Sequence, residues 1–79
     1  MTSFSTAIDI DIAIRLIRAY MARHPHAADT LEGVAQWWLA GQFSPDIVAA
    51  ALAQLRAAGE LECQALGERA LWRVHRSGA

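Results

Sequence analysis

The residues that most resemble a metal site lie around a proline, where His24 and His26 flank Pro25 and Asp29 follows. Imidazole nitrogens and a carboxylate oxygen are ligands that Zn²⁺ accepts in proteins. Three ligands from so short a segment lack the supporting Cys or Glu pattern that known metal-binding spacings share. We therefore predict that the chain binds no metal here.

Nucleophile chemistry is represented by a lone cysteine, Cys63, which follows Glu62 and has no activating cation beside it in the sequence. A thiol in such a setting is expected to be an inert strand residue. One cysteine also excludes an internal disulfide and fits a reduced, intracellular protein. The sequence contains no phosphate-binding glycine loop or nucleophile elbow. We expect a protein that is not an enzyme and needs no cofactor.

Arginines near the C-terminus have the chemistry to bind phosphate. Arg69, Arg73 and Arg76, together with His75, form what we call the basic strip. Guanidinium groups hold phosphate or carboxylate oxygens through paired hydrogen bonds. The strip therefore fits a nucleic-acid backbone or an acidic protein, and a strand face turned to solvent explains it equally well.

The composition sets limits on these functions. The 79 residues carry a net charge of −1, with 54% hydrophobic and 19% charged residues. That balance is typical of one folded domain, residues 1–79 with order expected from about 7 to 76, and not of a disordered chain. It argues against strong non-specific attraction to phosphate. No apolar span of membrane length interrupts the chain, so we expect a soluble, cytoplasmic protein without a membrane partner.

A first helix is predicted between residue 8 and Pro25. Isoleucine and aspartate alternate over residues 8–12 as in a strand, but a helical period fits the wider window. One face carries the expected core residues Ile10, Ala13, Ile14, Ile17, Tyr20 and Met21. A second row, here called the apolar stripe, consists of Ile8, Ile12 and Leu16. The stripe is either further core of a tight fold or a contact with helix 1 of a second copy in a dimer.

A second helix is predicted to begin at Asp29, because Glu32 three residues later completes a variant of the capping box. Gly41 lies just beyond its expected end. Its core face consists of Leu31, Val34, Ala35 and Trp38. Trp37 lies at the edge of that face, either partly buried against a neighbouring element or exposed as an anchor for a partner.

A third helix is predicted from Ser44 as its cap and Pro45 at its first position, and Gly59 ends it. Its inner face consists of Val48, Ala51, Leu52 and Leu55. After it the period changes to two, and two short runs meet at Gly67, which predicts a β-hairpin. In its second strand Trp72 and Val74 share the inner face, and Leu71, Arg73 and His75 share the other.

This order of elements over about residues 8–76 resembles the winged helix-turn-helix superfamily. "LEGVAQWWL" resembles its second helix, "SPDIVAAALAQLRAAGEL" its third, "GERALWRV" the returning strand of its wing, and "HAA" its brief first strand. The resemblance implies a mainly helical α+β fold in the order helix, short strand, helix, helix, strand, strand. The chain is similar in length to the FeoC branch, whose wing carries several cysteines. Here the wing has Cys63 alone, so a metal or cluster function does not carry over.

The resemblance implies DNA binding in transcriptional regulation as the first expectation. Gln54 and Arg56 would then contact bases, Arg69, Arg73 and Arg76 would contact phosphates, and the protein would form a dimer through helix 1. The electrostatics for this are weak, since the outward face of the third helix is mostly alanine and Asp46 would repel phosphate.

The alternative is a protein–protein interaction module. Its contact residues would be Trp37 and the three alanines Ala49, Ala50 and Ala53, here called the alanine face. Small side chains allow a partner helix to approach closely with little loss of side-chain entropy. The same alanines are also explained as good helix formers on a solvent face.

Overall fold

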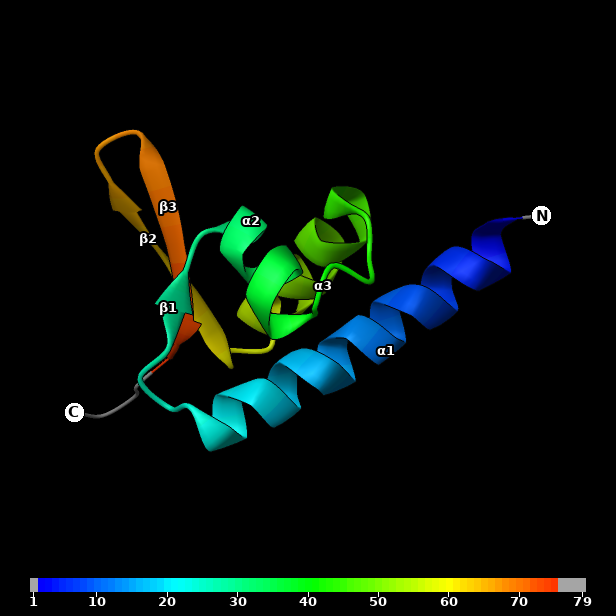
Figure 1. The fold of residues 1–79 in the computed structure, drawn as a ribbon, viewed down its shortest axis with the longest axis horizontal. Helices are drawn as coiled ribbons and strands as arrows, with labels where there is room; N and C mark the ends of the chain where they lie inside the picture. The colour runs from blue at the N-terminus through cyan, green and yellow to red at the C-terminus, as the bar shows by residue number, and fades with distance from the viewer. Residues whose placement is uncertain (1, 76–79) are drawn as a thin grey trace.

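The chain forms an α+β domain in the computed structural model, which describes residues 2–75 (Figure 1). The elements in chain order are α1 (Thr2–Arg23), β1 (Ala28–Asp29), α2 (Leu31–Gly33), η1 (Val34–Trp38), α3 (Pro45–Ala57), β2 (Leu61–Leu66) and β3 (Arg69–Val74). Because α2 runs directly into η1, the described chain has three helical segments and three strands. The predicted fold class and element order are confirmed.

The strands form one antiparallel sheet in the order β1-β3-β2. Gly67 and Glu68 join β2 to β3, and Gly67 has a φ of 62°, which a two-residue hairpin turn requires. The register pairs Glu62 with Arg73 and Cys63 with Trp72. Since side chains alternate along a strand, Trp72 lies on the face toward the helices and Arg73 on the face toward solvent. This division of β3 confirms the predicted one.

The hydrophobic core lies where α1 and α3 pack against each other and against the sheet. The inner face of α3 is closed to solvent, with Val48, Ala51, Leu52 and Leu55 at most 1% exposed. Ala13 and Ile17 of α1 are fully buried against the same cluster. Ser44 begins α3 as predicted, since its Oγ accepts a hydrogen bond from the backbone N–H of Ile47 at 3.4 Å. The predicted core residues therefore meet in one cluster.

The apolar stripe does not join this core as a whole. Leu16 is half-buried and packs on the core cluster, but Ile8 is 58% exposed and Ile12 is 40% exposed. The N-terminal part of α1 extends beyond α3 and η1, at the end marked N in Figure 1. The interpretation of Ile8 and Ile12 as buried core is thus wrong, because the helices that cover α1 lie on its other side.

The second helical segment begins one residue later than predicted. Thr30 is the cap: its Oγ1 accepts a hydrogen bond from the N–H of Gly33 at 3.1 Å. Asp29 pairs with Trp72 in the sheet, and its Oδ1 accepts a hydrogen bond from the N–H of Thr30 at 2.9 Å. Asp29 is therefore committed to the strand and to the turn, and Glu32 has no capping partner there. The capping-box interpretation was wrong for this reason.

The π-helical turn η1 contains two adjacent tryptophans, of which one is buried and the other exposed. It is closed by a hydrogen bond from the N–H of Leu39 to the carbonyl of Val34 at 3.0 Å. Trp38 points inward and is 8% exposed, and its ring stacks on Tyr20 of α1 with centroids 4.6 Å apart. Trp37 points outward and is 71% exposed. The placement of Trp38 in the core is confirmed, whereas Trp37 is not buried against a neighbouring element.

The contact between Asp29 and Gly33 gives a test of this start of α2. A Cβ added at Gly33 would lie 1.8 Å from Oδ1 of Asp29, so Gly33→Ala forces the carboxylate away from the turn that it caps. We expect Gly33→Ala to destabilise the protein when Asp29 is present and to be neutral or stabilising in an Asp29→Ala background. The coupling between the two changes should be about 0.5–3 kcal/mol in urea unfolding. Additive effects would contradict the contact.

Candidate functional site

The outward face of α3 is exposed but carries little charge. Asp46, Ala53, Gln54 and Arg56 are exposed, while Ala49 and Ala50 are half-buried. Arg56, in the last turn, is the single basic side chain of the helix. The predicted base-contacting pair is thus presented to solvent, with an acidic group at the opposite end of the same helix.

Arg73 of the basic strip already has a partner on the neighbouring strand. Its Nε donates a hydrogen bond to Oε2 of Glu62, its cross-strand neighbour in the register of the sheet. His75 approaches the other oxygen of the same carboxylate, with Nδ1 and Oε1 separated by 3.1 Å. One carboxylate therefore lies against two members of the strip and offsets the positive charge of Arg73.

The hydrogen bond from Arg73 lowers the pKa of the Glu62 carboxyl below its ordinary value of 4.5, and the contact with His75 lowers it further. A lowered pKa in the folded state means that the contact stabilises the fold above pH 4.5. That contribution is lost as the pH falls through the folded-state pKa. At neutral pH Glu62 is therefore an anion at the position where a phosphate would bind Arg73.

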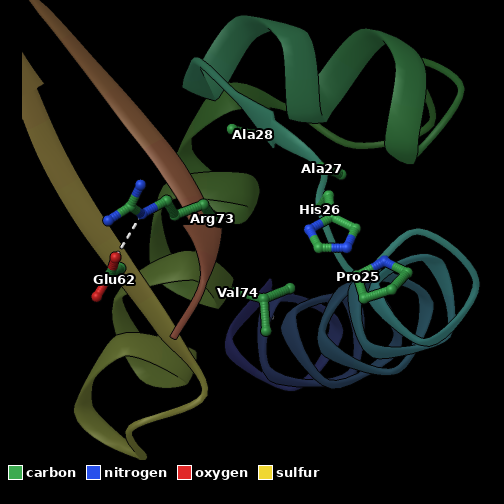
Figure 2. A pocket seen from close by; sticks show the side chains of 7 residues that line it. All are labelled: Pro25, His26, Ala27, Ala28, Glu62, Arg73 and Val74. Carbon is green, nitrogen blue, oxygen red and sulfur yellow. Dashed lines mark hydrogen bonds and ion pairs between the residues drawn. The ribbon is translucent and has the colours of Figure 1, made fainter. Parts of the chain in front are cut away.

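A cavity of about 520 Å³ lies beside this pair, between the connector after α1 and the end of β3 (Figure 2). The Arg73 side chain points toward Glu62, while Pro25 and His26 lie on the opposite side of the cavity. Val74 lies between the two sides. The cavity thus lies between the connector and the Glu62–Arg73 pair, with the guanidinium group held at the carboxylate.

Arg69 lies at the start of β3, next to the hairpin turn, and is exposed. It lines a second cavity of about 630 Å³ between the start of α2 and the hairpin, and two acidic residues, Glu32 and Glu68, line the same cavity. Arg76, the last member of the predicted strip, lies outside the described residues. Among the described members of the strip, Arg69 and Arg73 each have carboxylates in their surroundings.

A second ion pair was not foreseen from the sequence. Nε of Arg18 donates to Oε1 of Glu60 at 2.8 Å, and Nη2 donates to Oε2 at 2.6 Å. The pair joins α1 to the segment between α3 and β2, and the hydrogen bond lowers the pKa of Glu60. The partners are 42 residues apart in the chain, so neither helical spacing nor strand pairing could have indicated them.

The described residues contain no group of three or more His, Cys, Asp or Glu side chains placed to hold a metal ion. Cys63 is a free, half-buried cysteine on the inner face of β2, opposite Trp72. Within residues 2–75, no helix has the length and apolar character to cross a membrane.

Comparison of the chain with models of protein families, with curated proteins and with solved structures gives no match. The surfaces above are therefore interpreted from their own geometry and charge.

The Glu62 contact can be tested by carboxyl titration. In Arg73→Gln we expect the pKa of Glu62 to rise toward 4.5, because the largest cause of its lowering is removed. The measurement is the chemical shift of the Glu62 side-chain carboxyl carbon as a function of pH. Arg69→Gln is the matched control, since it removes an arginine from the same strand face and leaves the contact intact. An unchanged pKa in Arg73→Gln would contradict the pairing.

Proposed function

We propose that the chain is a non-enzymatic winged-helix binding module whose main partner is another protein. The fold supports the first part of this proposal, because three helical segments and a three-stranded antiparallel sheet follow in the order expected of a winged helix. The hairpin β2–β3 corresponds to the wing, and α3 to the helix that such domains often insert in a DNA groove.

The observation that carries the choice of a protein partner is the exposure of Trp37. Trp37 is 71% exposed, although Val34 and Trp38 of the same turn η1 are buried in the core. Indole rings bury a large area on binding and lose little conformational entropy, so tryptophan is enriched among the residues that dominate protein interfaces. A tryptophan held outward by the turn η1 is suited to that role.

The alanine face supplies a second contact surface under this proposal. Ala49 and Ala50 are half-buried and Ala53 is exposed, which leaves a smooth surface along α3. Such a surface fits a partner helix that presents large apolar side chains. Apolar side chains of a partner can bury this surface without any contact to a phosphate or a base.

DNA binding in transcriptional regulation is the second candidate, and one observation favours it. Arg69 is exposed next to the projecting turn of the hairpin, and Gln54 and Arg56 are exposed on α3. The two elements that winged-helix proteins apply to DNA thus each carry an exposed group able to bind it. The charge balance weighs against DNA binding, since Glu62 forms an ion pair with Arg73 and the whole chain has a net charge of −1.

The protein-docking proposal is tested with Trp37→Ala and the matched control Gln36→Ala, which alters the exposed neighbour of Trp37. Proteins retained from an extract of the source cells by the immobilised wild type are identified, and their affinities are measured with purified components. We expect Trp37→Ala to weaken a specific partner at least about tenfold, as for an interface hot spot, and Gln36→Ala to leave it unchanged. A partner bound equally by all three proteins would contradict the role of Trp37.

The DNA candidate is tested by titrating mixed-sequence duplex DNA into the protein while amide shifts are followed. DNA binding through the hairpin and α3 predicts shifts at Arg69 and Arg56. These shifts should saturate at low salt and weaken as salt rises. Glu62→Gln should strengthen such binding, because it releases Arg73. An absence of shifts at low salt, where electrostatic attraction is strongest, would eliminate the DNA candidate.

A further inference from the structure

Two members of the apolar stripe, Ile8 and Ile12, lie on the side of α1 away from the core, while Leu16 at the end of the stripe is half-buried against it. At 3.6 residues per turn, Ile8 and Ile12 lie roughly opposite Ala13 and Ile17, which are fully buried. Ile8 and Ile12 are 58% and 40% exposed, so together they leave about one whole isoleucine side chain in water. The elements that pack on α1 cover its other side, where Ile10 and Ala13 contact the core, and the N-terminal end of α1 extends beyond α3 (Figure 1). A second helix could therefore approach the stripe without meeting the rest of the domain.

The charges beside the stripe indicate which helix would fit. Asp11 and Arg15 are both exposed and lie one turn apart on the same flank of the stripe. When two identical helices pack antiparallel about a two-fold axis, each flank faces the same flank of the other helix in reverse order. Asp11 then faces Arg15 of the second copy, and Arg15 faces its Asp11. In a parallel pair the two copies of this flank lie on opposite sides of the contact, so Asp11 and Arg15 could not pair with each other across it.

We propose that α1 is a self-association surface, through which two copies of this chain pack antiparallel about a two-fold axis near Ile12. In this arrangement Ile12 meets Ile12 of the second copy, and Ile8 meets Leu16. The two Asp11–Arg15 pairs lie along one flank of the contact and set its direction. The proposal does not depend on the partner or nucleic acid that the rest of the domain binds.

The first test is the oligomeric state of the full chain by sedimentation, from about 10 μM to about 1 mM. We expect a reversible dimer that Ile12→Glu weakens at least about tenfold, because each protomer would bring a charge into the apolar contact. Thermal unfolding of Ile12→Glu and of the wild type, followed by circular dichroism, checks that a substitution at this exposed position leaves the fold intact. A chain that stays monomeric throughout, or an unchanged dimer in Ile12→Glu, would overturn the proposal.

The charge pattern gives a sharper test with two single reversals. Arg15→Asp places Asp against Asp in its own dimer, and Asp11→Arg places Arg against Arg, so each variant alone should dimerise at least about tenfold more weakly. In an equimolar mixture the opposite charges meet again in both pairs, and dimers should return as heterodimers. Reversals that dimerise like the wild type, or a mixture that stays monomeric, would overturn the role of the charges.

The direction of the pair is tested by disulfide formation in a Cys63→Ser background. Ile12→Cys places two thiols at the proposed axis, within the distance that a disulfide spans. Ile8→Cys places them eight residues apart along the antiparallel pair, about 12 Å, which a disulfide cannot span. We expect rapid cross-linking in Ile12→Cys and none in Ile8→Cys. Equal cross-linking in both would indicate a parallel pair and overturn the antiparallel arrangement.

Discussion

The structure depends on the close packing of α1 against α3. Ala13 on α1 and Ala51 on α3 are fully buried in the same core cluster, and side chains this small allow packed helices to approach closely. Leu52 and Leu55 of α3 are buried in the same cluster as Leu61 of β2. A domain of this size has one small core, so each helix can give it a single face. What the chain presents to partners is therefore decided by the faces that this packing leaves outside.

Much of the fold could be predicted because its signals are local. The cap at Ser44, the inner face of α3 and the hairpin turn at Gly67 each follow from the chemistry of a few neighbouring residues. The start of α2 could not be read in this way. Asp29 and Thr30 are both good caps. Thr30 is the cap in the structure because Asp29 pairs with Trp72 in the sheet and its carboxylate lies against Gly33.

The candidate site was less predictable than the fold, because its electrostatics depend on tertiary contacts. The sequence places Arg69, Arg73 and His75 on one strand, and alternation correctly places Arg73 and His75 on one face. The partner of Arg73 was missed, although a two-residue turn at Gly67 and Glu68 fixes the register that places Glu62 directly across from it. Helical periodicity correctly places Trp37 outside the core face but leaves open whether another element covers it, and the structure shows it exposed.

These contacts bear on how the domain binds a partner. Among the described residues, Arg18 and Arg73 form ion pairs with glutamates of the same chain, so part of the positive charge is neutralised within the molecule. The exposed groups that remain on α3 are mostly small and uncharged, while large apolar side chains stand free on η1 and at the start of α1. Burial of apolar area, which does not weaken with salt as phosphate binding does, is then the main free energy that this surface offers a partner. On the proposal of a winged-helix module with a protein partner, binding depends on apolar groups beside α3 and not on charge along α3.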